Sequence, residues 1–190
     1  MQSLLKKISQ CQLCETHLPH GVRPVVRASK KSKILIIGQA PGSKVHATGI
    51  PWDDPSGDQL RKWLGVDKNQ FYDESLFALM PMGFCYPGKG KSGDLPPRKE
   101  CAPQWHQSLL NKMSGIKLTL LIGVYAQNSY LKQKHKTLTE HVKNYRQFLP
   151  DCLPLPHPSP RNFIWQKNNP WFFDEVVSVL QKQVKSILQS

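Results

Sequence analysis

The chain has 190 residues and a formal net charge of +13 at pH 7, from 26 Lys and Arg against 13 Asp and Glu. Its hydrophobic content of 39% excludes a disordered chain, and no apolar run reaches the ~18 residues of a membrane span. We therefore expect a single domain over residues 1–190 that does not enter a membrane. The surplus of positive charge favours a polyanionic partner, above all nucleic acid, although it could also serve solubility or contact with a membrane surface.

The first 32 residues precede the predicted core. Residues 1–7 are too short and too polar for a signal peptide, so we expect a cytoplasmic protein, acting as a monomer. Apolar residues at helical spacing predict a helix over residues 2–9. A Cys-x-x-Cys pair follows at Cys11 and Cys14, and residues 17–32 form a basic loop.

The apolar run Ile34-Leu35-Ile36-Ile37 predicts a strand over residues 33–38 that is buried on both faces of a parallel sheet. The glycines and proline of residues 38–42 end it, at the edge where open α/β sheets bind ligands. Trp52 and the carboxylates Asp53, Asp54 and Asp58 come next in the chain. Such a loop can be an ordinary connection whose acidic residues cap a helix, or part of a site.

The remaining elements alternate between strand and helix, which implies a parallel sheet covered by helices. The expected fold is a three-layer α/β/α sandwich with a central, mainly parallel four-stranded sheet. Three loops, 38–58, 82–97 and 157–162, then converge on one edge, as a site requires. The other predicted strands are 76–81, 118–123 and the edge strand 153–156, and the other predicted helices are 57–65, 99–113, 126–130, 137–148 and 171–187.

Four of the five cysteines lie beside turn residues: Cys11, Cys14, Cys85 and Cys101. In a cytosolic chain a Cys-x-x-Cys pair indicates metal or redox chemistry and not a structural disulfide. Four thiolates suit a 4Fe–4S cluster or structural zinc, and four cysteines without a ligand are the remaining alternative. Cys152 follows a different pattern and is interpreted as a small buried apolar side chain.

These residues resemble the uracil-DNA glycosylase superfamily, most closely its iron–sulfur class. Gly38-Gln39-Ala40-Pro41-Gly42 resembles the first family motif, GEAPG, and His157-Pro158-Ser159-Pro160-Arg161 resembles the second, HPS followed by a basic residue. Residues 48–52 fall on the family's QGRPF, and the four cysteine regions occur in the family's order. The resemblance covers residues 11 to about 162, and it implies that the four cysteines hold a 4Fe–4S cluster, with structural zinc as the alternative.

The chain departs from the family pattern at three positions. Gln39 replaces the Glu of the first motif, and Ala40 stands where the classical uracil-excising enzymes have Asp. A related class places an Asp in a downstream T-G-D-A-S-G stretch, on which Asp54 falls. Pro81 lies four residues ahead of Cys85, in the region where the iron–sulfur class has an Asn that reads uracil.

The resemblance implies a DNA repair glycosylase that flips uracil or another deaminated or damaged base out of the stack and hydrolyses its N-glycosidic bond. A non-catalytic nucleic-acid-binding protein on the same scaffold is the alternative, because the first motif has no carboxylate. The predicted catalytic residues are Asp54 and His157, with Asp53 as the next candidate carboxylate. Base contacts are predicted for Gln39, Ala40 and Trp52, and phosphate contacts for Ser159, Arg161, Lys89 and Lys91.

Overall fold

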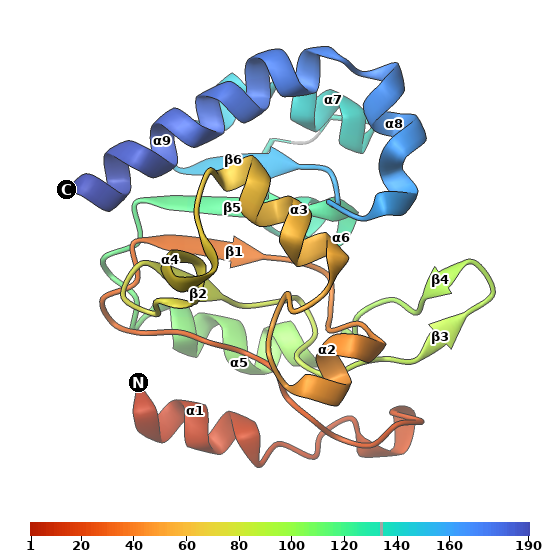
Figure 1. Ribbon diagram of the computed structural model, residues 1–190. Helices are drawn as coiled ribbons and strands as arrows, with labels where there is room; N and C mark the ends of the chain where they lie inside the picture. Colours follow the sequence, from red (N-terminus) through yellow and green to blue (C-terminus); the bar gives the residue numbers. More distant parts are fainter. Residues whose placement is uncertain (134) are drawn as a thin grey trace.

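The computed structural model describes residues 1–133 and 135–190. Its central sheet has four strands in the order β2-β1-β5-β6, and every neighbouring pair is parallel (Figure 1). This confirms the predicted sheet, including the place of β6 at an edge, where Pro154 is tolerated. The strands are β1 (Ile34–Ile37), β2 (Phe77–Leu79), β5 (Leu118–Ile122) and β6 (Cys152–Leu155).

Helices cover both faces of the sheet, as the alternation of side chains along β1 requires. Ile34 and Ile36 join one apolar core, and Leu35 and Ile37 join a second core on the opposite face. The predicted three-layer sandwich is therefore confirmed. The first core receives side chains from α3 (Pro55–Leu64), α4 (Lys68–Tyr72), α7 (Leu138–Lys143) and α9 (Ser178–Gln189), and the second from α1 (Gln2–Ser9), α5 (Cys101–Leu110) and α6 (Gly123–Tyr130).

Several element boundaries differ from the sequence expectation. Helix α3 begins two residues early, because Asp54 caps it and a proline can occupy its first turn. The predicted helix 137–148 stops at Lys143 and continues as a 3₁₀ turn over Tyr145–Phe148, and the last helix opens with a π-helical segment, Phe172–Val177. No helix in the described residues is long and apolar enough to cross a membrane.

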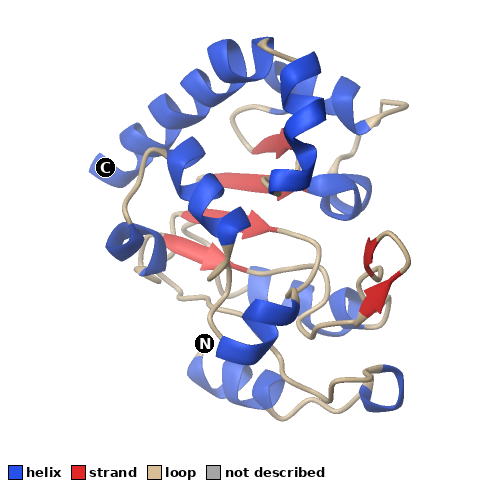
Figure 2. Ribbon diagram, turned by 45° about the vertical axis from the view of Figure 1, so that its right-hand side comes forward, coloured by secondary structure: helices blue, strands red, loops and turns tan. Residues whose placement is uncertain are grey.

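The sequence reasoning missed several short elements around the strand ends. The predicted loop 82–97 contains a small antiparallel hairpin, β3 (Lys89–Gly90) with β4 (Gly93–Asp94), which lies apart from the central sheet (Figure 2). Helices α2 (Ser43–Thr48) and α8 (Phe163–Asn168) were likewise not expected. The strand arrows point toward the side that holds this hairpin, α2 and α8 (Figure 1), so these elements surround the carboxyl edge of the sheet.

A buried histidine ties α5 to the segment that follows β2. His106 is 3% exposed, and its Nε2 lies 3.1 Å from the carbonyl oxygen of Pro81 while its Nδ1 lies 2.6 Å from the hydroxyl of Tyr130. Because a carbonyl only accepts, Nε2–H donates to Pro81 and Nδ1 accepts from Tyr130. Burial lowers the pKa of His106 to about 4, so the ring is neutral at physiological pH.

We predict that this histidine makes the protein lose stability in mild acid. Below pH 6.5, the ordinary pKa of histidine, His106 becomes protonated in the unfolded chain but stays neutral in the folded protein. Because the unfolded state then binds more protons, the free energy of unfolding should fall as the pH drops from 6.5 toward 4. The loss attributable to this residue is about 3 kcal/mol over that range. Denaturant unfolding at pH 7 to 4 should therefore show a shallower pH dependence for His106→Gln than for the exposed control His17→Gln. Parallel curves for the two variants would contradict this assignment.

Candidate active site

A cavity of about 420 Å³ opens at the carboxyl edge of the sheet. This size falls within the ordinary range for small-molecule sites. The loops after β1, β2 and β6, together with the β3–β4 hairpin, supply its walls, so the predicted convergence of three loops is found in the structure. Its lining includes Gly38, Gln39, Ala40, Gly42, Lys44, Trp52, Asp54, Pro81, Asp94, His157, Ser159 and Arg161.

Trp52 is held in the cavity wall by an unusual backbone conformation. Its φ of 58° lies in the left-handed region that a bulky residue rarely adopts. The indole ring lies against Gly38, where an added Cβ would come within 2.9 Å of Trp52 Cζ2. The ring centroid lies 5.8 Å from that of His157 at an interplanar angle of 31°. Strain of this kind occurs at functional sites when the surrounding contacts enforce it.

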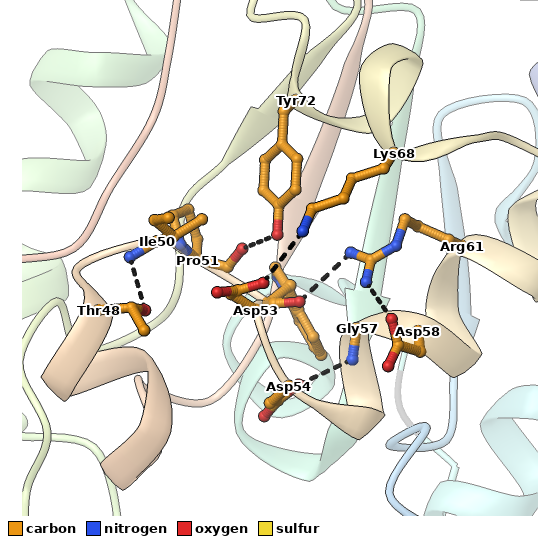
Figure 3. A network of polar contacts seen from close by, with 11 residues as sticks. Thr48, Ile50, Pro51, Asp53, Asp54, Gly57, Asp58, Arg61, Lys68 and Tyr72 are labelled. Atoms are coloured by element: carbon orange, nitrogen blue, oxygen red, sulfur yellow. Dashed lines mark hydrogen bonds and ion pairs between the residues drawn. The ribbon is translucent and has the colours of Figure 1, made fainter.

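Those contacts come from α3 and α4, as Figure 3 shows. The Tyr72 hydroxyl donates to the carbonyl oxygen of Pro51 at 2.9 Å, and Arg61 Nη1 donates to the carbonyl oxygen of Trp52 at 3.3 Å. Arg61 is itself buried and forms a 2.6 Å ion pair with Asp58. The loop that carries Trp52 is therefore fixed by side chains that lie outside the cavity lining.

The three candidate carboxylates of this loop have different surroundings. Asp54 lines the cavity, and its Oδ1 also accepts a 2.8 Å hydrogen bond from the Gly57 N–H as the N-cap of α3. Asp53 lies outside the cavity lining with its carboxylate 3.5 Å from Lys68 Nζ, and Asp58 is paired with Arg61 (Figure 3). Of the three, the structure brings Asp54 to the cavity, where it combines capping with access to a ligand.

His157 follows β6 and lies close to two carboxylates. Burial lowers its pKa, and the negative charges of Asp54 and Asp94 oppose that shift without reversing it. The imidazole is therefore neutral at physiological pH and can donate a hydrogen bond without carrying a charge. Asn162 Nδ2 donates to the His157 carbonyl oxygen at 2.7 Å, which fixes the backbone at the end of the strand.

The remaining predicted base contacts also line the cavity. Gln39 uses its side-chain Nε2 to donate to the carbonyl oxygen of Leu95 at 3.1 Å, which connects the first motif to the hairpin. Ala40 contributes a small apolar surface. Pro81 also lines the cavity, but its ring offers no hydrogen-bonding group and its carbonyl is already engaged by His106. The side chain at position 81 therefore cannot recognise a base by hydrogen bonding.

The predicted phosphate-binding residues form two groups around the opening. Ser159 and Arg161 line the cavity. Ser159 Oγ accepts a 3.2 Å hydrogen bond from the backbone N–H of Arg161, and the Arg161 side chain is exposed. Lys89 and Lys91 lie outside the lining, exposed on the hairpin. Two exposed apolar side chains that sequence reasoning missed, Phe163 at 67% and Ile164 at 70%, follow Arg161 on α8.

Sequence reasoning also missed Asp94 and Lys44 in the lining. Asp94 lies in a Gly-rich, basic stretch that was interpreted as a loop, and no motif or periodicity distinguishes it from a solvated residue. Lys44 follows the first motif directly. Of these two residues, only Lys44 could have been found from the sequence, because it lies just after the 38–42 segment at which a ligand is expected.

The family model of the uracil DNA glycosylase superfamily matches residues 26–181 of the chain. The chain belongs to this superfamily. Among solved structures, the chain also resembles a solution NMR structure from Methanosarcina acetivorans that is named a "putative Uracil DNA glycosylase". The two share 16% sequence identity over 82% of this chain and 93% of that chain, with a TM-score of 0.48. A likeness at this level carries no functional argument.

The superfamily match begins at residue 26, after Cys11 and Cys14. In the structure this pair nevertheless lies in the same pocket as Cys85 and Cys101. Cys11, Cys14, Cys85 and Cys101 line one small apolar pocket beside Phe84 and Trp105, whereas Cys152 lies in β6. As they stand, no group of three or more His, Cys, Asp or Glu in the described residues could hold a metal ion.

The chemistry of the pocket is that of a thiol-only donor set. Burial raises the pKa of Cys85 to about 11 and that of Cys101 to about 12, so these thiols are neutral unless a nearby cation stabilises the thiolate. The nearby carboxylate, Glu100, is engaged by Arg98 Nη2 at 2.6 Å. Four soft sulfur donors suit an iron–sulfur cluster or zinc, so the chemistry of the four cysteines, though not their arrangement as described, fits such a centre.

Proposed function

We propose that this chain is a DNA glycosylase that hydrolyses the N-glycosidic bond of uracil or another deaminated or damaged base in DNA. The observation that carries the proposal is the single cavity that gathers a carboxylate, a neutral imidazole and an aromatic ring at the carboxyl edge of the sheet. Members of the superfamily are DNA glycosylases, and the +13 charge suits a DNA substrate.

The cavity residues can support each part of such a reaction. The Trp52 ring offers a stacking face for a flipped base, a contact worth roughly 1–3 kcal/mol. His157 can donate to a carbonyl oxygen of the departing base, where negative charge develops. Asp54 can offset the positive charge that develops on the sugar. Arg161 and Ser159 can bind phosphates beside the lesion, and the apolar side chains of α8 can enter the base stack that the flipped base leaves.

The position of the chain within the superfamily is also part of the proposal. The cysteine pocket and the first motif favour the iron–sulfur class, and the use of Asp54 resembles the class with a downstream Asp. Residues 1–32 contribute Cys11 and Cys14 to the same pocket as Cys85 and Cys101, which supports one domain over residues 1–190.

A non-catalytic nucleic-acid-binding protein is the second candidate, because Gln39 and Ala40 leave the first motif without a carboxylate. The two are separated by incubating the purified protein with single- and double-stranded DNA containing uracil, hypoxanthine and other lesions, followed by alkali to reveal abasic sites. Strand cleavage above that of undamaged DNA supports the glycosylase. Binding without cleavage across the lesion panel supports the alternative.

Two substitutions of Asp54 should separate its capping role from its chemical role. Asn caps helices about as well as Asp, whereas Ala loses the bond to Gly57 and should lower the free energy of unfolding by about 0.5–2 kcal/mol. Both variants should lower single-turnover excision by at least ~100-fold, because each removes the charge that acts in the transition state. Asp53→Asn is the control and should excise at close to the wild-type rate. A stable Asp54→Asn variant with wild-type excision would assign Asp54 to capping alone.

DNA affinity should fall linearly with salt concentration on logarithmic axes, because Lys and Arg release counterions from phosphates. Arg161→Glu should weaken binding to all sequences alike. It should also make the slope of log affinity against log salt shallower by the amount expected for about one lost phosphate contact. Lys182→Glu, which makes the same change in net charge on α9, should have a smaller effect. Fluorescence anisotropy between low and physiological salt tests both statements. Affinity that does not change with salt would contradict nucleic-acid binding.

We also propose that Cys11, Cys14, Cys85 and Cys101 together hold one metal centre, a 4Fe–4S cluster in preference to zinc. Such a centre would cross-link the N-terminal segment to the segment after β2 and to the start of α5. Its role here is structural, since the four cysteines line a pocket separate from the cavity that contains Asp54 and His157.

Anaerobically purified protein should accordingly be brown and should contain iron and acid-labile sulfide. Cys101→Ser should lose the colour and the metal, whereas Cys152→Ser, outside the pocket, should retain both. A colourless protein with one zinc per chain would reject the cluster and keep the site. Protein without bound metal after anaerobic purification would reject both.

A further inference from the structure

The β3–β4 hairpin brings a carboxylate to the cavity that none of the roles above uses. Asp94, the last residue of β4, lines the same cavity as Asp54 and His157. Its negative charge is close enough to His157 to act on the titration of that ring. In a protein with 26 Lys and Arg, an acidic residue at the predicted DNA-binding opening would repel phosphates, so its position calls for a physical reason.

Close contacts hold Asp94 against the first motif. A Cβ added at Gly42 would lie 3.4 Å from Asp94 Oδ2, so the carboxylate lies close to the backbone of the GQAPG segment. The next residue, Leu95, accepts the side-chain hydrogen bond of Gln39 at 3.1 Å. The first motif, which has no carboxylate of its own, therefore has one supplied to it by the hairpin.

The carboxylates in and near the cavity differ in their availability as a base. Asp54 uses one oxygen to accept from the N–H of Gly57 at the start of α3, so part of that carboxylate is committed to capping the helix. Asp53 and Asp58 face Lys68 and Arg61. Asp94 accepts a hydrogen bond from the Tyr86 hydroxyl, whose pKa is raised by burial and by the Asp94 carboxylate, and Asp94 is the exposed carboxylate of the cavity lining.

We propose that Asp94 is a second catalytic carboxylate, which takes a proton from the water that attacks C1′ of the flipped nucleotide. This inference rests on the proposed glycosylase function. The bond between C1′ and the base nitrogen breaks, and its electron pair leaves with the base, whose negative charge the neutral His157 stabilises by donating a hydrogen bond. The water oxygen forms a bond to C1′, and the water proton passes to Asp94 and then to solvent or the departing base. The products are the free base and an abasic sugar.

This division of roles explains why two carboxylates are present. Asp54, fixed by its cap, and Asp94, on the hairpin, both place negative charge beside the sugar cation, and Asp94 also supplies the proton acceptor. General base catalysis contributes ~10²–10⁴-fold to a rate. Asp94→Asn should therefore slow single-turnover excision by at least ~100-fold. DNA affinity should stay equal or rise, because a charge that repels phosphate has been removed.

The decisive experiment measures binding and needs no known substrate base. Fluorescence anisotropy compares two DNA duplexes, one containing a pyrrolidine abasic analogue that is cationic at the sugar and one containing the neutral tetrahydrofuran analogue. Wild-type protein should bind the cationic site more tightly. The preference is the dissociation constant for the neutral site divided by that for the cationic site. Asp94→Asn should reduce this ratio by at least ~10-fold, which corresponds to about 1.4 kcal/mol. Asp94→Glu keeps the charge and should retain part of the preference.

Two controls match the change. Ser92→Ala alters the same hairpin without removing charge, and Asp174→Asn removes one negative charge on the π-helical segment before α9; both should keep the wild-type ratio. If Asp94→Asn also keeps that ratio, the role of Asp94 is overturned while the glycosylase proposal stands. If the wild-type protein does not prefer the cationic site, both are overturned.

Discussion

The geometry of the cavity depends on how closely helix α3 approaches the backbone of Trp52. A Cβ at Gly57 would lie 1.7 Å from the carbonyl oxygen of Trp52, so only glycine permits this contact. The approach allows Arg61 to hold the same carbonyl and keeps Trp52 at positive φ, with its ring against Gly38. Asp54, two residues after Trp52 and at the cap of the same helix, is placed by the same contact. One backbone approach thus positions the Trp52 ring and the Asp54 carboxylate together.

A second constraint connects the cavity to the cysteine pocket. The segment after β2 contributes Pro81 to the cavity and Cys85 to the pocket, and α5 contacts it twice. His106 donates to the carbonyl of Pro81, and the N–H of Phe84 donates to Cys101 Sγ at 3.3 Å. A ligand that fixes the cysteines would therefore also restrain the cavity wall at Pro81. A metal centre in the pocket, as proposed, would thus act on the cavity through its structural effect alone.

The sequence predicted the features that depend on long apolar runs and on motif order. The strands around Ile34, Phe77, Leu118 and Leu153 and the sandwich class follow from patterns that persist over several residues. The four cysteines that line one pocket are singled out by their spacing and motif order. The short elements could not be predicted in this way. Helix α2 and the hairpin are shorter than any segment that is stable alone, and tertiary contacts such as that between Gln39 and Leu95 hold them. Asp94 was missed for this reason, because only the folded hairpin brings it to Gly42.

The proposed function places two opposing electrostatic requirements on the site. DNA binding favours positive charge, which Arg161 and Lys44 provide at the cavity, whereas cleavage of the glycosidic bond favours negative charge beside the sugar. Two carboxylates near His157 would, in water, favour the imidazolium. Burial outweighs them and keeps the ring neutral. A charged imidazole would pair with Asp54 or Asp94 and neutralise the charge that the sugar cation of the proposed reaction needs, so in that reaction the burial of His157 would also keep the carboxylates available.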